Sequence, residues 1–264
     1  MHEEYTIWEQ QGRPVPPPHG IKIWVVREYG ARFGLRTLIE TGTFHGDMLH
    51  GVKYLFDPIY SIELDLHLHE AAKVQFAPYG NIKLLQGDSG EKLGPLLANL
   101  REPALFWLDG HYSGGITARG SRDTPIVQEL EHIFRHPIKD HVLLIDDARC
   151  FVGQDDYPTI DELREIIHGY DRTLHFEVRN DIIRIHRQEP AISEKAFQPM
   201  SHLLQLDGYP FVTEVYRQFL NREPEPEGLH IYAQLLAGGM PKLEIIASVL
   251  LSDESNYLLR SYPL

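Results

Sequence analysis

Residues 37–46, TLIETGTFHG, predict a short buried strand, a tight glycine turn and the start of a helix. Leu38 and Ile39 lead into the strand. Gly42 and Gly46 mark the turn, and apolar residues then recur at helical spacing. A strand that leads into a helix through a glycine turn is typical of the ligand-binding edge of a doubly wound α/β sheet.

Two features of this turn indicate which ligand it would bind. A dinucleotide-binding turn uses three glycines, the middle one to let the backbone approach the pyrophosphate, and here Phe44 takes that place. The strand also ends in Glu40, whose negative charge would repel a phosphate and attract a cation. S-adenosylmethionine (SAM) carries an ammonium and a sulfonium and no phosphate, so the pattern favours SAM over NAD.

Length and composition set the broad class of protein. A chain of 264 residues, of which 42% are apolar, is long enough for a medium-sized domain with a good core and a smaller second domain. The formal net charge of -13 argues against non-specific binding to nucleic acid or anionic membranes, because both need basic patches. The single cysteine, Cys150, excludes an internal disulfide framework, and the first residues lack the layout of a signal peptide. We therefore expect a cytoplasmic protein without membrane insertion.

Composition along the chain predicts four segments. Residues 1–19 form a polar, proline-rich arm, residues 20–187 the main α/β domain, residues 188–209 a linker and residues 210–264 a small helical domain. Within the main domain five strand–helix units precede a two-stranded hairpin. The strands are expected within residues 37–46, 60–65, 82–89, 104–108, 142–145, 174–178 and 182–186. This pattern predicts a doubly wound, mostly parallel seven-stranded sheet.

Polar residues follow the second and third predicted strands. Glu63 comes after Glu40 at close to the spacing of about 20 residues at which such folds hydrogen-bond a ribose diol. The alternative for Glu63 is a solvated strand end. Asp88 or Ser89 could contact an adenine edge, or Asp88 could only cap the following helix.

Strands four and five both end in acidic residues. Asp109 and His111 follow the fourth strand, and Asp146 and Asp147 follow the fifth. The carboxyl ends of neighbouring parallel strands meet at one edge of a sheet. We therefore expect these four side chains beside the reactive end of the ligand.

Three interpretations of these residues stay open. In the first, Asp109, Asp146 and Asp147 bind Mg²⁺, Ca²⁺ or Mn²⁺, since all-oxygen ligands select these ions over zinc. In the second, which is compatible with the first, His111 is a general base. In the third, the aspartates cap helices and the histidine is a loop donor. Adjacent carboxylates are costly unless a cation or a helix dipole offsets their charge, and this favours the metal.

Three arginines flank the predicted site: Arg119, Arg122 and Arg149. They would either clamp an anionic substrate, such as a sugar phosphate or a uronate, or pair with the nearby aspartates. The sequence contains no HExxH motif and no cluster of cysteine and histidine, which argues against a zinc enzyme.

The motifs resemble those of class I SAM-dependent methyltransferases, and most closely the metal-dependent O-methyltransferases of macrolide and cephamycin biosynthesis. The resemblance covers roughly residues 20–187 and implies the class I, Rossmann-like methyltransferase fold. It also implies SAM binding by nine residues: Glu40, Thr41, Gly42, Thr43, Gly46, Glu63, Asp88, Ser89 and Asp109. The metal ligands implied are Asp109, Asp146 and Asp147, and the implied catalytic residues are His111, Asp109 and Asp146. The loop after His111 departs from those enzymes.

The last part of the chain has a resemblance of its own. The segment around residues 211–229, with its apolar spacing and the run FLNREP, resembles a small helical domain of unknown function. That domain is often appended to bacterial glycan-modifying and surface proteins, so the resemblance implies a carbohydrate context. We expect its helices to contact the main domain, a protein partner or a second copy of the chain.

Three hypotheses of function follow. The first is a SAM-dependent O-methyltransferase that acts on a sugar or polyol hydroxyl in glycan or natural-product tailoring, with metal assistance. The second is a binding or scaffolding module of a glycan-assembly system that keeps the fold without turnover. The third, disfavoured by Phe44 and Glu40, is a nicotinamide-dependent oxidoreductase.

Overall fold

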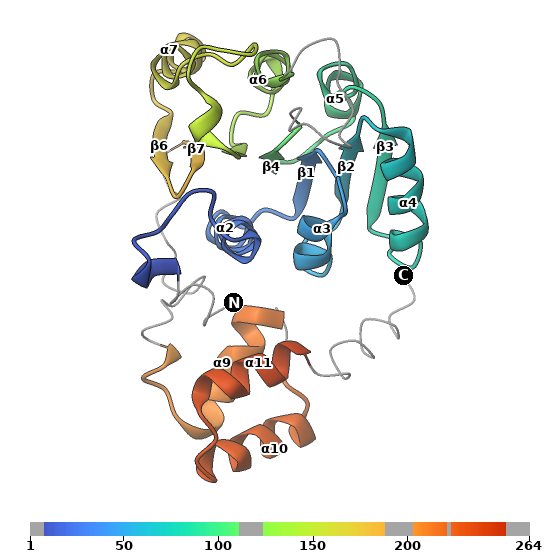
Figure 1. Ribbon diagram of the computed structural model, residues 1–264. Coiled ribbons are helices and arrows are strands. Elements are labelled where there is room, and N and C mark those ends of the chain that lie inside the picture. Colours follow the sequence, from blue (N-terminus) through green and yellow to red (C-terminus); the bar gives the residue numbers. More distant parts are fainter. Residues whose placement is uncertain (1–7, 111–123, 188–202, 221–222, 252–264) are drawn as a thin grey trace. The chain divides into compact units, whose positions relative to one another are not determined.

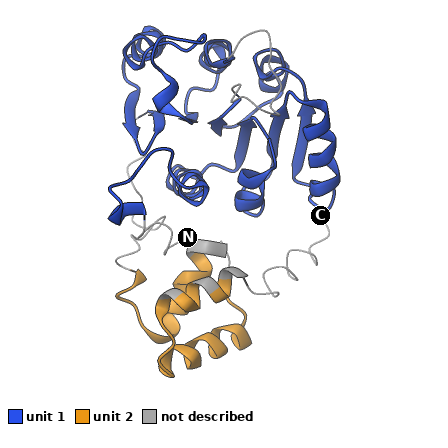
Figure 2. Ribbon diagram, viewed as in Figure 1, with its two compact units in different colours: residues 1–191 blue, residues 192–264 orange. Residues whose placement is uncertain are grey.

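A computed structural model of the chain describes residues 8–110, 124–187, 203–220 and 223–251 (Figure 1). The chain forms two compact units, Met1–Ala191 and Ile192–Leu264 (Figure 2). The first has two hydrophobic clusters and the second has one of its own. The two units are therefore described separately.

The first unit is built on a seven-stranded sheet with the strand order β3-β2-β1-β4-β5-β7-β6. The strands are β1 Thr37–Thr41, β2 Ile59–Glu63, β3 Ile82–Gln86, β4 Ala104–Leu108, β5 Val142–Ile145, β6 His175–Arg179 and β7 Ile182–His186. Strands β1 to β5 are parallel to one another, and β7 is antiparallel to both β5 and β6. The predicted series of strand–helix units followed by a hairpin is confirmed.

Helices cover both faces of this sheet (Figure 1). One face carries α2 His19–Arg32, α3 Asp47–Val52 and α4 Leu66–Phe76, and the other carries α5 Ser89–Leu97, α6 Ile126–Arg135 and α7 Ile160–Tyr170. Successive residues of β4 alternate between the two clusters: Leu105 and Trp107 pack on the α2 side, Phe106 and Leu108 on the α5 side. Strands β1 and β4 are buried along their whole length, as expected of parallel strands covered on both faces.

The helix after the glycine turn is shorter than its apolar spacing predicts. Helix α3 ends at Val52, although the apolar pattern continues through Leu55 and Phe56. Phe56 is nevertheless buried in the core, where a Cβ placed on Gly30 would lie 2.5 Å from its Cζ atom. Pro58 follows closely, and the residue before a proline avoids the helical conformation. The apolar spacing therefore predicted the burial of Phe56 correctly, but Leu55 is exposed and the helix is shorter than expected.

The second unit consists of short helices around a small core. They are α9 Gly208–Leu220, α10 Pro226–Ala237 and α11 Lys242–Leu251. Phe211, Val215 and Tyr216 of α9 pack with Tyr232 of α10 and Ile245 of α11. Among the helices that the structure describes in either unit, none is both long enough and apolar enough to cross a membrane.

Candidate active site

The predicted site residues that the structure describes lie at one edge of the sheet. Strands β2, β1, β4 and β5 are adjacent and parallel, so their carboxyl ends face the same way. Glu63 ends β2, Gly42 follows β1, Asp109 follows β4 and Asp146 follows β5. The central part of the sheet therefore brings these four residues together, although they are far apart in the sequence.

The glycine turn after β1 is pressed against the end of β4. Gly42 has a φ of 86°, and a Cβ atom placed on it would lie 2.4 Å from the carbonyl oxygen of Asp109. The strands are held at this point by two hydrogen bonds, from Gly42 N to Ile62 O (2.9 Å) and from Asp109 N to Thr41 O (3.0 Å). Only glycine fits both this conformation and this approach.

Phe44 occupies the place of the middle glycine of a dinucleotide-binding turn, and its backbone amide is hydrogen-bonded to a side chain of the protein. Its amide donates to Glu63 Oε2 at 2.8 Å, and Asp65 N donates to Glu63 Oε1 at 2.8 Å. The amide that would face a pyrophosphate in a dinucleotide site therefore faces a carboxylate. The Phe44 ring itself is 42% exposed, with a backbone φ of 48°.

Glu40 is buried beneath this turn. The hydroxyl of Ser61 donates to Glu40 Oε2, and Ser61 Oγ lies 2.6 Å from Thr43 Oγ1. Burial raises the pKa of the Glu40 carboxyl to about 8, and the nearby charge of Glu63 acts in the same direction. The carboxyl is therefore largely protonated at neutral pH when no ligand is bound. A cationic ligand bound next to it would favour its ionised form.

Asp88 caps the helix that follows β3. It is the N-cap of α5 and accepts a hydrogen bond from Gly90 N at 2.9 Å, which is the capping alternative left open by the sequence. Ser89 is buried beside the end of β4, where its hydroxyl lies 3.2 Å from a Cβ placed on Gly110. Contact of Asp88 or Ser89 with an adenine stays a prediction.

The three aspartates predicted to bind metal come together. Asp109, Asp146 and Asp147 each offer a carboxylate oxygen, and these oxygens all lie within 4.8 Å of one another. Asp146 and Asp147 are buried, whereas Asp109 is half-buried. We call this set the acidic trio. His111, the predicted general base, lies outside the described residues, as do Arg119 and Arg122.

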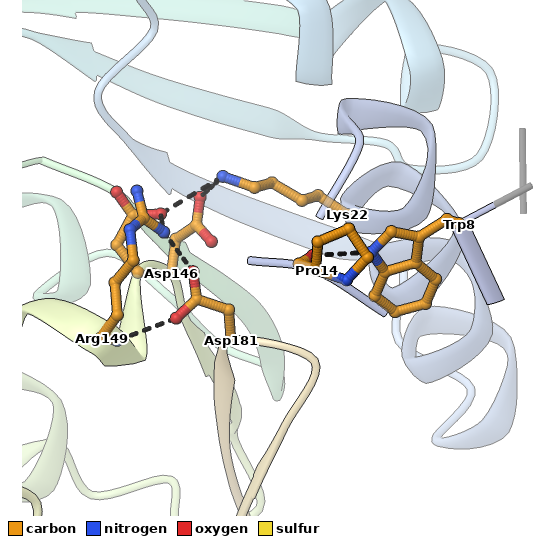
Figure 3. A network of polar contacts seen from close by, with 7 residues as sticks. Trp8, Pro14, Lys22, Asp146, Arg149 and Asp181 are labelled. Carbon is orange, nitrogen blue, oxygen red and sulfur yellow. Dashed lines mark hydrogen bonds and ion pairs between the residues drawn. The ribbon is translucent and has the colours of Figure 1, made fainter. Parts of the chain in front are cut away.

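A lysine that was not predicted from the sequence contacts two aspartates of the trio. Lys22, from α2, donates a hydrogen bond to Asp146 Oδ2, and its Nζ lies 3.4 Å from Asp147 Oδ1 (Figure 3). Burial lowers the pKa of Lys22, but the charges of Asp146, Asp147 and Asp109 outweigh it, so the pKa is raised and the ammonium is kept charged. The available signal was a single lysine in an otherwise apolar run, residues 21–26.

Arg149 connects the trio to a second ion-pair network, and it contacts the same oxygen of Asp147 that Lys22 approaches. Arg149 Nη1 donates to Asp147 Oδ1 at 2.7 Å and also to Asp181 Oδ2. The backbone N–H of Arg149 donates to Asp181 Oδ1 at 2.8 Å. Of the two alternatives for Arg149, pairing with aspartates is the one that the structure contains.

The donor atoms at this edge fit a cation and a polar ligand. Asp146 Oδ1 is buried and has no hydrogen-bond partner among the residues that the structure describes. In the same part of the chain, the buried hydroxyl of Thr41, next to the glycine turn, also has no such partner. Burial raises the pKa of Asp146 even though Lys22 acts against it, so this carboxylate would gain from a further positive charge. Oxygen donors of this kind suit Mg²⁺, Ca²⁺ or Mn²⁺.

The strand order, with β7 as the antiparallel strand, decides the fold class. The first unit has the class I methyltransferase fold. Structures that resemble this methyltransferase fold include an O-methyltransferase from Bacillus cereus in complex with SAH, at 10% identity and a TM-score of 0.48, covering 70% of this chain and 90% of that one. They also include the O-methyltransferase TomG from Streptomyces achromogenes, involved in tomaymycin synthesis and in complex with SAM, at 11% identity and a TM-score of 0.44, covering 71% of this chain and 89% of that one.

A putative caffeoyl-CoA O-methyltransferase from Staphylococcus aureus is similar at the same level, with 11% identity, a TM-score of 0.44 and coverage of 70% of this chain and 91% of that one. Outside the methyltransferase fold, residues 193–258 match the family described as Domain of unknown function (DUF4214). No curated protein matches the chain in a sequence comparison.

Proposed function

We propose that the chain is a SAM-dependent O-methyltransferase that acts on a hydroxyl of a sugar or polyol, assisted by a divalent cation at the acidic trio. The observation that carries the proposal is the hydrogen bond from the Phe44 amide to Glu63, beside the buried Glu40. At the glycine turn, the charge of Glu63 disfavours a phosphate-bearing cofactor, and the Glu40 carboxyl would ionise next to a cation but not next to a phosphate. The same groups suit a cofactor with an ammonium and a ribose.

The residues of the cofactor edge have distinct proposed roles. Gly42 lets the turn pack against the end of β4 at Asp109, and Glu40 would offset the positive charge of the methionine portion. Glu63 uses two acceptor positions for backbone amides and retains others for the ribose hydroxyls, since each carboxylate oxygen has two lone pairs. SAM, when bound, supplies an electrophilic methyl group on its sulfonium.

The acidic trio would hold and activate the acceptor. Asp109, Asp146 and Asp147 would hold a divalent cation, which would supply the Lewis acidity that makes an acceptor hydroxyl easier to deprotonate. Vicinal hydroxyls can chelate one cation, which is why a sugar or polyol suits the site. The hydroxyl proton passes to His111 or to one of the aspartates, and much of the rate comes from alignment of the oxygen with the methyl group.

The proposed function also includes a cellular location and a partner for the helical unit. We place the enzyme in the cytoplasm, in glycan or natural-product tailoring. The helical unit would contact a protein partner or a second copy of the chain, for which Ile231 and Leu235 of α10 offer exposed apolar side chains. Light scattering of the full chain, compared with the Ile231→Ser, Leu235→Ser double variant, tests self-association.

The experiment that tests the cofactor is thermal unfolding with SAM, S-adenosylhomocysteine or NAD, each with and without Mg²⁺. A ligand at 100 times its dissociation constant adds about 2.7 kcal/mol to the free energy of unfolding. A shift with the first two ligands and none with NAD is expected. A shift with NAD alone would support the oxidoreductase, and no shift at all would support the scaffold.

The role of the trio is tested by transfer of a labelled methyl group to a panel of sugars and polyols. Asp146→Asn should abolish transfer while S-adenosylhomocysteine still binds. Asp140→Asn is a matched control, because Asp140 is mostly exposed and lies outside the trio. Full turnover by Asp146→Asn would contradict the proposed role of a metal ion in the reaction.

A further inference from the structure

Lys22 is placed where the charge of a bound cation is needed. Its ammonium contacts both Asp146 and Asp147, and the charge of Asp109 also acts on it. The pair is not a surface ion pair, since the side chain of Lys22 is only 13% exposed and that of Asp146 is fully buried. An ammonium enclosed in this way is the counter-ion of the trio.

An ammonium and a divalent cation compete for the same oxygen atoms. A cation held by the trio would lie about 2.0 to 2.6 Å from its oxygen ligands, and those ligands are all within 4.8 Å of one another. Lys22 already uses Asp146 Oδ2 and approaches Asp147 Oδ1. Two positive charges at such close range repel strongly in a partly buried site.

Arg149 supplies a second positive charge next to the trio, so the carboxylates keep one counter-ion when Lys22 leaves. Arg149 donates to Asp147 Oδ1, the same oxygen that Lys22 approaches, and it also pairs with Asp181. Asp146 Oδ1 is buried and has no hydrogen-bond partner in the part of the chain that the structure describes, so Lys22 satisfies only half of that carboxylate. The long, flexible lysine stem can leave more easily than a residue fixed in the backbone.

We propose that Lys22 is a tethered competitor of the divalent cation: its ammonium occupies the trio when no cation is bound and leaves when a cation binds. The proposal rests on the proposed function only in treating the trio as a cation site, and it does not involve the cofactor edge. Because Lys22 belongs to the same chain, its effective concentration is high and it weakens cation binding. The cation then binds best when acceptor oxygens add further ligands.

The test is a titration of the full chain with Mn²⁺ in the absence of cofactor. Binding is monitored by the electron paramagnetic resonance signal of the free Mn²⁺. Lys22→Met keeps the length of the side chain and removes the charge, and it should bind Mn²⁺ at least about tenfold more tightly than wild type. Lys22→Arg should stay weak, and Lys83→Met, at an exposed lysine of β3, should match wild type. Adding Asp109→Asn to Lys22→Met should abolish the gain.

A second measurement needs no variant. Acetylation of Lys22 by acetic anhydride, read by mass spectrometry, should be slow in the wild-type chain and should rise when Mg²⁺ is added, because the ammonium leaves the trio. Equal Mn²⁺ affinity in wild type and Lys22→Met, absence of Mn²⁺ binding from both, or acetylation that Mg²⁺ leaves unchanged would each overturn the proposal. Calorimetry with S-adenosylhomocysteine reports the cofactor site separately, so failure of the proposed function is seen independently.

Discussion

Lys22 and Asp146, 124 residues apart in the chain, form a hydrogen-bonded ion pair at the carboxyl edge of the sheet (Figure 3). The pair joins α2, which precedes the first strand, to the end of β5. The Lys22 ammonium, which balances the negative charge of the trio, therefore also holds two elements of the fold together. The stability of the α/β unit is therefore linked to the occupancy of its candidate active site.

This link predicts a difference between two variants. Removing one partner of a buried ion pair costs about 3 to 5 kcal/mol, because the other charge is left uncompensated. Lys22→Met should therefore lose stability in metal-free buffer and recover much of it when Mg²⁺ is added. Asp146→Asn should lose a similar amount without recovery. Urea denaturation with and without Mg²⁺ measures both, and equal responses of the two variants to Mg²⁺ would contradict the link.

The glycine turn predicts that one added methyl group disrupts the site. Gly42→Ala would force a positive φ and a contact of 2.4 Å with the Asp109 carbonyl, so both folding stability and S-adenosylhomocysteine affinity should fall sharply. Gly34→Ala is the matched control, since Gly34 also has a positive φ, 63°, but open space around its Cβ position. The control should cost only about 1 to 2 kcal/mol. Equal losses in the two variants would mean that the close approach of β1 and β4 is unimportant.

Glu63 predicts a selective loss of cofactor binding. In Glu63→Gln an amide NH₂ would face the N–H of Phe44 or Asp65, and the negative charge at the proposed ribose site would be gone. Affinity for S-adenosylhomocysteine, measured by calorimetry, should fall at least about tenfold, which corresponds to roughly 1.4 kcal/mol. Glu70→Gln, at an exposed position of α4, should bind as wild type does. Unchanged binding by Glu63→Gln would show that Glu63 does not bind the cofactor and only accepts hydrogen bonds from the backbone.

Glu40 predicts that stability falls as pH rises. Its pKa is raised by burial to about 8 from 4.5, so between these values the folded chain keeps a proton that the unfolded chain releases. The free energy of unfolding should therefore fall across this window, by up to about 5 kcal/mol. Glu40→Gln removes the effect, so its stability relative to wild type should increase steadily with pH. A relative stability that stays constant from about pH 5 to about pH 8 would show that Glu40 is ionised in the fold.

A pair of buried histidines predicts the opposite trend at lower pH. His141 Nδ1 accepts from Ala104 N at 3.0 Å, and its Nε2 lies 3.0 Å from His136 Nδ1. Burial, with a contribution from His136, lowers the pKa of His141 to about 4 from 6.5. The proton taken up by the unfolded chain should reduce stability as pH falls through this window, by up to about 3 kcal/mol. Nitrogen NMR should find the His141 ring neutral at about pH 5.5, and a charged ring there would refute the assignment.

Local pattern was sufficient for most of the sheet. The predicted strands at residues 104–108, 142–145 and 182–186 have the same bounds in the structure. The first two are short apolar runs, and the third directly follows the turn residues Asn180 and Asp181. Given parallel strands, the position of the acidic residues directly after β4 and β5 was enough to bring Asp109, Asp146 and Asp147 together. The fold class and the membership of the trio thus follow from the sequence by itself.

The tertiary structure decided the features that depend on contacts between distant segments. Nothing near Lys22 in the sequence indicates that its ammonium lies among carboxylates more than a hundred residues away, because its local pattern is that of an apolar helix. The raised pKa of Glu40 and the pairing of Arg149 with Asp181 likewise depend on burial and on neighbours from other strands. Hydrophobic periodicity reports which face of an element is buried, whereas the charges that meet within a site are set by how the completed elements pack.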